Sequence, residues 1–369
     1  MKLLFIITGL GMGGAEVQLC NLVDEFQSKH NNKIIIITLT KDKVINIPNS
    51  KRIKIINLNI EKKPISFLFG LIKARAIIKK FKPDIVHSHM FHANIFSRIL
   101  RLFCKIPILI STAHNKNEGG KLRMFLYRIT DKLATISTNV SQEAVDSFIL
   151  QKATTSKKML TMFNGIDTTI FSFNEVVRKK KRAEINLDNE TDLILAVGRL
   201  TKAKDYPNLL HAFSKLNLSK KNKLVIIGDG EEKENLQQLA YDLKISKDII
   251  WLGIRHDVQD WMSACDLFVL SSAWEGFGLV VAEAMACERL VIGTDSGGVK
   301  EVINKYGLVI PPEDSIALSS VITEYLTLPE HKRNTLGILA RRHIIDTFSI
   351  EKISQKWLDL YSELLNKYE

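Results

Sequence analysis

Short apolar runs of three to eight residues alternate with longer amphipathic segments along the chain. Such runs predict buried strands, and the amphipathic segments between them predict helices. The first half contains five predicted strands, at 2–8, 33–40, 84–87, 106–112 and 132–137. A helix is predicted over 15–28, and Ser141 is expected to cap another that runs through Phe148.

The same alternation restarts in the second half, after a polar stretch. Its predicted strands lie at 193–197, 224–227, 249–252, 267–270, 290–292 and 308–310. Strands that alternate with helices favour parallel sheets covered by helices, here two doubly wound α/β domains facing a cleft. The stretch between the halves, 167–192, includes five consecutive basic residues, 178–182. We interpret it as a solvated linker and first helix rather than as a nucleic-acid patch.

The length and composition agree with two domains in a reducing compartment. The chain has 369 residues, more than one core usually organises, and 46% of them are hydrophobic. No apolar run approaches the ~18 residues of a membrane-spanning helix, and the N-terminus lacks a signal-peptide pattern. Four cysteines lie far apart without a C-x-x-C pair, which disfavours zinc and a disulfide framework and fits the cytoplasm.

The positive charge is concentrated in the first half. Residues 1–170 hold 26 Lys and Arg against 11 Asp and Glu, a net +15, whereas the remainder holds 26 against 29, a net −3. This asymmetry predicts an anionic partner. Basic and apolar residues interleave over 67–80 and 95–105, as in helices that bind anionic membranes, although the apolar faces could instead belong to the core. A nucleic-acid binder is a competing hypothesis, weakened by the absence of aromatic-basic surface motifs.

The first glycine-rich loop permits an alternative function. Gly9, Gly11 and Gly14 match the G-x-G-x-x-G pattern of dinucleotide-binding loops, which predicts an NAD(P)-dependent oxidoreductase. However, no acid closes the second strand, and Asp42 lies beyond the usual offset. Glu16 also places a carboxylate in the first helical turn, where it would oppose a pyrophosphate. We therefore favour a loop that approaches the cleft without binding NAD.

A second glycine turn is the strongest candidate site. Gly276 and Gly278 follow a predicted buried strand and precede a predicted helix over 279–286. The free N–H groups at such a helix start suit a phosphate. Glu275 and Glu283 cannot hold phosphate, but their carboxylates accept hydrogen bonds from sugar hydroxyls. Phosphate and hydroxyls together indicate a nucleotide sugar.

Two cations could neutralise the diphosphate. Arg199 and Lys204 follow another buried strand and offer a planar guanidinium and a point charge. The chain contains no D-x-D pair, so the metal that many sugar-transfer enzymes use has no evident ligands. We therefore expect no metal and no cofactor, with fixed cations in their place.

Histidines gather near the ends of predicted strands. His87, His89, His92 and His114 have no carboxylate or cysteine at ligand spacing, which disfavours zinc. Each lies just past a predicted strand, where the residues of a cleft are found in open α/β sheets. His114 first, and His89 second, are expected to hydrogen-bond a sugar.

These motifs together resemble retaining glycosyltransferases of family 4, whose E-x7-E motif corresponds to Glu275 and Glu283. The resemblance covers essentially the whole chain, in order, through Gly11-Met-Gly-Gly-Ala-Glu16, Asp84-Ile-Val-His-Ser-His89, Asn164-Gly-Ile-Asp167, Gly198-Arg-Leu, Gly228-Asp-Gly, Trp251-Leu-Gly, Asp266-Leu-Phe-Val-Leu-Ser-Ser272 and Thr294-Asp-Ser-Gly-Gly298. The family's Lys-Gly after Gly-Arg-Leu is Lys204-Asp205 here, which leaves the lysine in place and alters the turn.

The resemblance implies a GT-B fold, in which two Rossmann-like domains with doubly wound parallel sheets face each other across a cleft. The acceptor domain would comprise 1–167 with the C-terminal helix at about 350–369, and the donor domain 168–349. In the donor domain, the resemblance implies that Glu283 binds the ribose and that Arg199 and Lys204 neutralise the leaving group. The donor sugar and diphosphate would be held by Glu275, Gly276 and the N–H groups of Phe277, Gly278 and Leu279. In the acceptor domain, His114 would lie near the reacting carbon, and Gly13 and Gly14 near the diphosphate. His114, Glu275, Arg199 and Lys204 are the predicted catalytic residues, and the family's usual mechanism is front-face attack with retention.

The sequence therefore predicts a glycosyltransferase. Its expected donor is a nucleotide-diphosphate hexose or N-acetylhexosamine, UDP-linked, and its acceptor a hydroxyl of a lipid-linked saccharide in bacterial surface polysaccharide or lipopolysaccharide synthesis. The expected location is the cytoplasm, peripheral on the inner face of the cytoplasmic membrane, which the basic first domain would contact. No nucleic-acid partner is expected.

Overall fold

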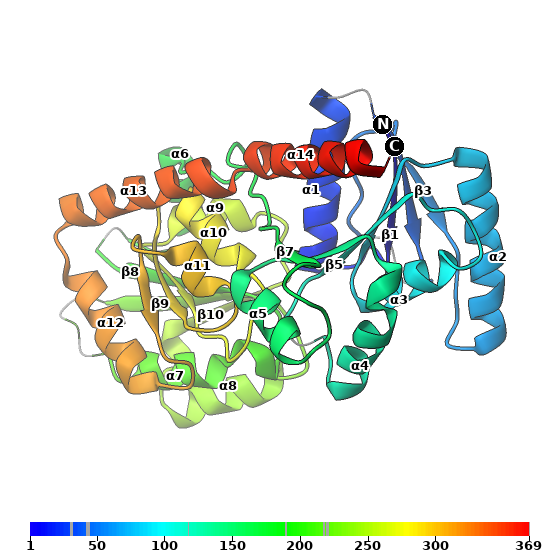
Figure 1. The fold of residues 1–369 in the computed structure, drawn as a ribbon. Helices are drawn as coiled ribbons and strands as arrows, with labels where there is room; N and C mark the ends of the chain where they lie inside the picture. The colour runs from blue at the N-terminus through cyan, green and yellow to red at the C-terminus, as the bar shows by residue number, and fades with distance from the viewer. Residues whose placement is uncertain are drawn as a thin grey trace. The chain divides into compact units, whose positions relative to one another are not determined.

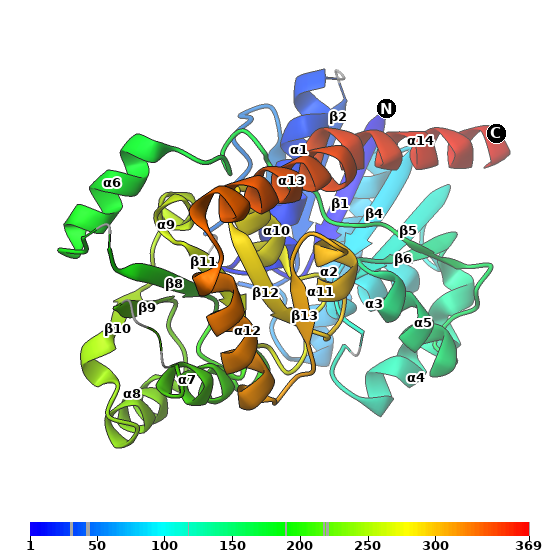
Figure 2. The ribbon, with the colours of Figure 1, turned by 90° about the vertical axis from the view of Figure 1, so that its left-hand side faces the viewer.

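The computed structural model describes residues 1–29, 32–41, 45–116, 118–188, 190–216, 218 and 221–368. The chain divides into two compact units. Unit 1 comprises Met1–Gly165 and Ile350–Glu369, and unit 2 comprises Ile166–Ser349. Figures 1 and 2 show the ribbon in two views. The cleft expected from the sequence stays a prediction.

A parallel sheet forms the centre of unit 1. Within its described residues, seven strands pair in the order β3-β2-β1-β4-β5-β6-β7. Their bounds are β1 Lys2–Ile7, β2 Lys33–Thr38, β3 Lys54–Asn57, β4 Ile85–His89, β5 Ile108–Ala113, β6 Ile136–Asn139 and β7 Met159–Thr161. The central strands are almost wholly buried because helices cover both faces of the sheet.

The helices of unit 1 pack into three cores. They are α1 Gly14–Lys29, α2 Pro64–Phe81, α3 Phe91–Leu100, α4 Lys121–Thr130, α5 Gln142–Leu150 and α14 Ile350–Tyr368. One core joins α1 and α14 to one face of β1, through residues such as Phe26, Trp357 and Tyr361. A second core joins α2 and α3 to the opposite face, and α4 packs with α5 in a third. The last helix of the chain is therefore part of the first unit.

Unit 2 repeats this plan with a parallel sheet of order β10-β9-β8-β11-β12-β13 among its described residues. The strands are β8 Asp192–Val197, β9 Asn222–Ile227, β10 Ile249–Gly253, β11 Leu267–Leu270, β12 Leu290–Thr294 and β13 Leu308–Ile310. The helices are α6 Glu175–Glu184, α7 Tyr206–Ser214, α8 Lys233–Asp242, α9 Val258–Ala264, α10 Leu279–Ala286, α11 Val299–Ile303, α12 Ser315–Thr327 and α13 Glu330–Phe348. The helices α7, α8 and α12 share one core with the sheet.

The predicted alternation of strands and helices is confirmed, with local corrections. Ser141 caps α5, its hydroxyl accepting a hydrogen bond from the N–H of Ala144 at 3.2 Å. The strand expected over 132–137 is wrong in its bounds, because Asp131–Leu133 forms a 3-10 turn and β6 begins only at Ile136. The strand β6 pairs with β5 and β7, and its last residues, Thr138 and Asn139, are polar but buried, so an apolar pattern does not reveal them. The short strands β3 and β7 were also not predicted.

The basic run 178–182 was predicted to belong to a solvated linker and first helix. The helix is present, but the run is not fully solvated, which corrects that part of the prediction. It lies on α6, where Lys181 and Arg182 are buried. The guanidinium of Arg182 forms an ion pair with Asp266 at 3.1 Å, and Arg178 contacts the same carboxylate at 2.6 Å. Lys181 pairs with Asp257 at 2.7 Å. The run therefore fastens α6 to unit 2.

Candidate functional site

The turn between β11 and α10 has the geometry predicted for an anion site. All four residues of β11 are buried, and α10 starts after Gly278, whose φ of 83° lies in the left-handed region. A Cβ at Gly278 would also lie 2.9 Å from the side chain of Val299, so both conformation and space require glycine. The first N–H groups of α10 have no acceptor within the helix, which gives the turn a positive end.

Lys204 and Glu275 meet beside this turn. The ammonium group of Lys204 donates a hydrogen bond to Oε1 of Glu275, and the hydroxyl of Ser272 donates to the same oxygen at 2.8 Å. The hydroxyl of Ser271 donates to the carbonyl oxygen of Lys204 at 2.9 Å. The lysine is thus attached to the turn through both its side chain and its backbone.

Glu283 lies within α10, and burial raises the pKa of its carboxyl to about 7. The charge of Lys204 opposes this shift, so the two groups share one electrostatic environment. Lys204 thus hydrogen-bonds Glu275 directly and acts electrostatically on Glu283, which lies in the second turn of α10. Arg199 follows β8, but its side chain is exposed and has no hydrogen bond or ion pair with another described residue.

The glycine turn at 228–230 supports the turn that carries Arg199. A Cβ at Gly228 would overlap the carbonyl oxygen of Gly198, and one at Gly230 would overlap that of Leu200. The N–H of Leu200 donates to the carbonyl oxygen of Asp229 at 3.0 Å. Close backbone packing thus accounts for these glycines.

In unit 1, two of the predicted histidines are in contact. Nδ1 of His89 and Nε2 of His114 lie 3.2 Å apart, and their rings are 5.5 Å apart. Burial lowers the pKa of His114 to about 4 and that of His89 well below its usual value, so both are neutral near pH 7. His114 immediately follows β5, as predicted, and can act as a neutral hydrogen-bonding group.

The placement predicted for the other histidines is partly wrong. His87 lies inside β4 rather than past it, and His89 is the last residue of that strand. Nδ1 of His87 lies 2.7 Å from the hydroxyl of Tyr361 on α14, and its Nε2 lies 2.6 Å from the hydroxyl of Thr112. His87 is therefore a structural link between the sheet and α14. His92 belongs to α3.

Glu118 was not predicted as a site residue, yet it holds the loop that carries His114. One carboxylate oxygen accepts the backbone N–H of His114 at 2.9 Å, and the other accepts the hydroxyl of Tyr127 at 3.2 Å. Burial raises the pKa of this carboxyl above its ordinary value. The only sequence signal was an acid four residues after His114. Ser272 is likewise absent from the predicted site, although it lies in the Ser-Ser landmark that follows β11.

The first glycine loop leads into α1 with an acid at its helix start. Gly13 precedes the helix, Gly14 opens it, and a Cβ at Gly13 would overlap the carboxylate of Glu16. That carboxylate therefore lies against the loop, where it opposes a pyrophosphate at this position. Asp42, which lies beyond the usual offset of the acid in the dinucleotide pattern, falls outside the described residues.

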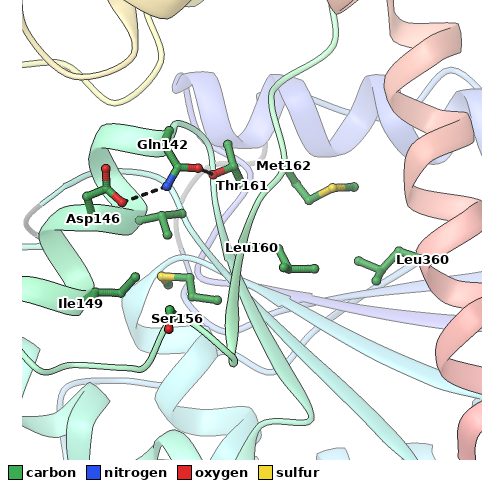
Figure 3. Close-up of a pocket in the computed structure, with 10 residues that line it drawn as sticks. Gln142, Asp146, Ile149, Ser156, Leu160, Thr161, Met162 and Leu360 are labelled. Atoms are coloured by element: carbon green, nitrogen blue, oxygen red, sulfur yellow. Dashed lines mark hydrogen bonds between the residues drawn. The ribbon is translucent and has the colours of Figure 1, made fainter.

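A separate pocket of about 460 Å³ lies elsewhere in unit 1 (Figure 3). It is lined by residues of α5 and β7 together with Leu360 of α14. The hydroxyl of Thr161 donates to Gln142 at 2.7 Å, and the amide of Gln142 donates to Asp146 at 2.8 Å. None of the predicted site residues lines this pocket.

The part of the chain that the structure describes offers neither a metal cluster nor a membrane span. Its residues contain no group of three or more His, Cys, Asp or Glu side chains arranged to hold a metal ion. They also contain no helix with the length and apolar character needed to cross a membrane.

Two known protein families match successive parts of the chain. Residues 12–170 match the family described as Glycosyltransferase Family 4, and residues 177–343 match Glycosyl transferases group 1. The chain is a family 4 glycosyltransferase. This membership does not favour the oxidoreductase alternative.

Similar proteins of known role and similar solved structures are also glycosyltransferases or share the fold of this chain. It is 25% identical over 392 residues to the O-antigen biosynthesis glycosyltransferase WclY of Escherichia coli, covering 100% of this chain and 99% of that protein. It is 27% identical over 329 residues to the N-acetylgalactosamine-N,N'-diacetylbacillosaminyl-diphospho-undecaprenol 4-alpha-N-acetylgalactosaminyltransferase of Campylobacter jejuni, covering 84% and 86%. The crystal structure of Anabaena HepE in complex with UDP superimposes with a TM-score of 0.87 at 19% identity, covering 98% and 100%. The fold is GT-B.

Proposed function

We propose that this glycosyltransferase moves a hexose or N-acetylhexosamine from a UDP-linked donor to a hydroxyl of a lipid-linked saccharide, with retention at the anomeric carbon. The observation that carries the proposal is the cluster of Lys204, Glu275 and Ser272 beside the start of α10. A cation and a helix start suit a diphosphate, and a carboxylate suits sugar hydroxyls.

The proposal assigns a role to each site residue. In unit 2, Glu283 accepts hydrogen bonds from the ribose, and Glu275 with Gly276 and the N–H groups of 277–279 holds the donor sugar and the diphosphate. Lys204 and Arg199 neutralise the leaving group. In unit 1, neutral His114 hydrogen-bonds the donor sugar, with His89 against it. Gly13 and Gly14 approach the diphosphate, which requires the carboxylate of Glu16 to turn away from the loop. No metal takes part.

The chemical step follows from these roles. The bond between the anomeric carbon and the diphosphate oxygen breaks, and a bond to the acceptor oxygen forms on the same face of the sugar. The hydroxyl proton of the acceptor passes to the departing phosphate oxygen. The protein contributes leaving-group stabilisation and orientation, and none of its described side chains is assigned as a general base.

The names of the relatives support the choice of donor and acceptor. The Anabaena structure contains UDP, the Campylobacter relative is named for a diphospho-undecaprenol acceptor, and the Escherichia coli relative is named for O-antigen biosynthesis. We place this chain in bacterial surface polysaccharide synthesis, peripheral on the inner face of the cytoplasmic membrane.

The test is a transfer assay with a panel of nucleotide sugars and a lipid-diphosphate saccharide, with the product anomer determined by NMR. One UDP-sugar should raise the melting temperature and be consumed, because a ligand of the folded state stabilises it. Arg199→Ala and Glu283→Ala should each abolish measurable transfer without unfolding, whereas Glu231→Gln, an exposed acid of unit 2, should not. Near-normal turnover by both alanine variants would refute the site.

A further inference from the structure

Helix α2 of unit 1 carries a stripe of large apolar side chains that no other part of the unit covers. Ile65, Leu68, Phe69 and Ile72 are all more than half exposed, with Ile65 at 71%. Their spacing of three and four residues places them on one side of the helix. The opposite side, which includes Leu71 and Ala74, is buried in the core. The helix is therefore apolar on two faces, and only one of them is explained by the fold.

A similar stripe lies on α4. Leu122, Phe125 and Ile129 are exposed, with Leu122 at 72%, whereas Met124 and Tyr127 face the core. Exposure of several large apolar residues at helical spacing costs solubility, so it usually marks a surface that binds something.

The two stripes lie on helices that both contact α3 in unit 1. Helix α3 packs against both α2 and α4 and lies between them (Figure 1). Burial, followed by the positive charges of Arg123 on α4 and Lys62 just before α2, lowers the pKa of His92 on α3. The guanidinium of Arg123 in the first turn of α4 lies 4.8 Å from the ring centre of Phe91, the first residue of α3, so the starts of these two helices meet. Leu102 and Phe103, at the end of α3, extend the exposed apolar area.

The segment that carries these helices is strongly basic. Residues 61–133 contain 15 Lys and Arg against four Asp and Glu. Two of the four acids, Glu118 and Asp131, are buried, so they do little to balance the surface charge. On α2, Lys73, Lys79 and Lys80 are exposed next to the apolar stripe.

We propose that the surface formed by α2, the end of α3 and α4 binds an anionic lipid bilayer, with the stripes of α2 and α4 inserted among the lipid headgroups and acyl chains. Apolar side chains that point outward and are flanked by lysine and arginine are the combination that such an interface favours. Each basic residue near an anionic leaflet adds attraction of its own. A second copy would bring the same positive charge against this face, which disfavours self-association.

This inference deepens the proposed function, because it assigns the residues through which the enzyme would reach a lipid-linked acceptor. It also changes the interpretation of 67–80. The sequence left open whether its apolar residues belong to the core, and the structure divides them between core and surface.

The experiment is co-sedimentation of the full chain with vesicles of phosphatidylglycerol and phosphatidylcholine, and with vesicles of phosphatidylcholine alone. We expect binding to the anionic vesicles only. Leu68→Ser/Phe69→Ser combined with Leu122→Ser/Phe125→Ser should weaken it at least tenfold. The matched control is Ile316→Ser/Ile338→Ser, two exposed apolar residues of unit 2, which should bind like the unaltered protein. If the four-serine variant fails to fold, Lys73→Glu/Lys79→Glu/Lys80→Glu replaces it, with the same expected loss.

Three results would overturn the proposal. They are no binding of the unaltered protein to anionic vesicles, equal binding by the four-serine variant, and self-association of the unaltered protein that the four-serine variant loses. A thermal-shift measurement with UDP on each sample separates this proposal from the proposed function. If the four-serine variant loses vesicle binding but keeps the thermal shift that UDP causes in the unaltered protein, the loss concerns this surface alone. Vesicle binding without any nucleotide response would refute the proposed function and leave the surface standing.

Discussion

Lys204 donates a hydrogen bond to the carboxylate of Glu275, and both side chains lie at the start of α10. The cation proposed to neutralise the diphosphate is thus already held by the acid proposed to hold the donor sugar. Ser272 donates to the same carboxylate oxygen and fixes its position. The pair is therefore ordered before any donor arrives, which reduces the reorganisation that binding requires.

Loss of Lys204 should reduce transfer far more than stability. We expect Lys204→Ala to lower kcat by a factor of about 10²–10³, equivalent to ~2–4 kcal/mol in the barrier, because a fixed charge at the leaving group is lost. Steady-state kinetics with the identified donor measures this change. Lys202→Ala is the control, since that exposed lysine lies in the same 3-10 turn. Equal effects from both substitutions would contradict the assignment.

Nucleotide binding should depend on pH through Glu283. Burial raises the pKa of this carboxyl to about 7, so it is mostly protonated at pH 6 and mostly ionised at pH 8. If the ionised form accepts the ribose hydroxyls, affinity for UDP should rise about tenfold between these pH values, with release of a proton. Calorimetry in two buffers of different ionisation enthalpy measures both effects. Glu283→Gln should abolish the pH dependence, and a profile that it leaves intact would rule out this carboxyl.

The same group should link stability to pH in the opposite direction. Its pKa in the folded protein lies above the ordinary value of 4.5, so the folded state holds the proton more tightly than the unfolded state. Proton binding to Glu283 therefore contributes its full share to the free energy of unfolding below about pH 4.5, and this contribution is lost as the pH rises through 7. Urea unfolding at several pH values should therefore give a flatter profile for Glu283→Gln than for the unaltered protein.

Asp266 should be essential for the stability of unit 2. Its carboxylate contacts Arg178 and Arg182 and accepts the N–H of Leu193 at 2.8 Å. Asp266→Ala should lower the free energy of unfolding by ~3–5 kcal/mol, because Arg182 is left buried without its counter-charge. Chemical denaturation measures the loss. The exposed Lys179 gives the control substitution Lys179→Ala, which should change stability by less than about 0.5 kcal/mol.

The family's glycine after Lys204 is replaced by Asp205, and the structure shows why aspartate is accepted. Its φ is 43° in the left-handed region, and its side chain caps α7 through the N–H of Asn208 at 3.4 Å. Asp205→Ala should cost about 2 kcal/mol, because it loses the cap and retains the strained conformation. Asp205→Gly should cost only a few tenths, since glycine adopts this conformation freely. Thermal melts that rank the two variants in the reverse order would contradict this explanation.

The sequence by itself determined most of the order of strands and helices, without the short strands β3 and β7, and the strand, glycine turn and helix of the β11–α10 unit. These features depend on short-range properties: apolar periodicity, the freedom of glycine, and the unpaired N–H groups that any helix start provides. The helix at 279–286 was therefore predicted with its observed bounds. Lys204 could be selected as a candidate because it is a cation that shortly follows a predicted strand, and this too is a local feature of the sequence.

Tertiary structure alone decided which polar and apolar side chains are buried. Arg182 is buried because Asp266 faces it from 84 residues away, and His87 is fixed by Tyr361 from 274 residues away. The apolar residues of α2 divide between core and surface because the sheet covers only one side of that helix. The free energy of burying a group depends on the partner that meets it, and partners so distant along the chain are brought together only by the fold.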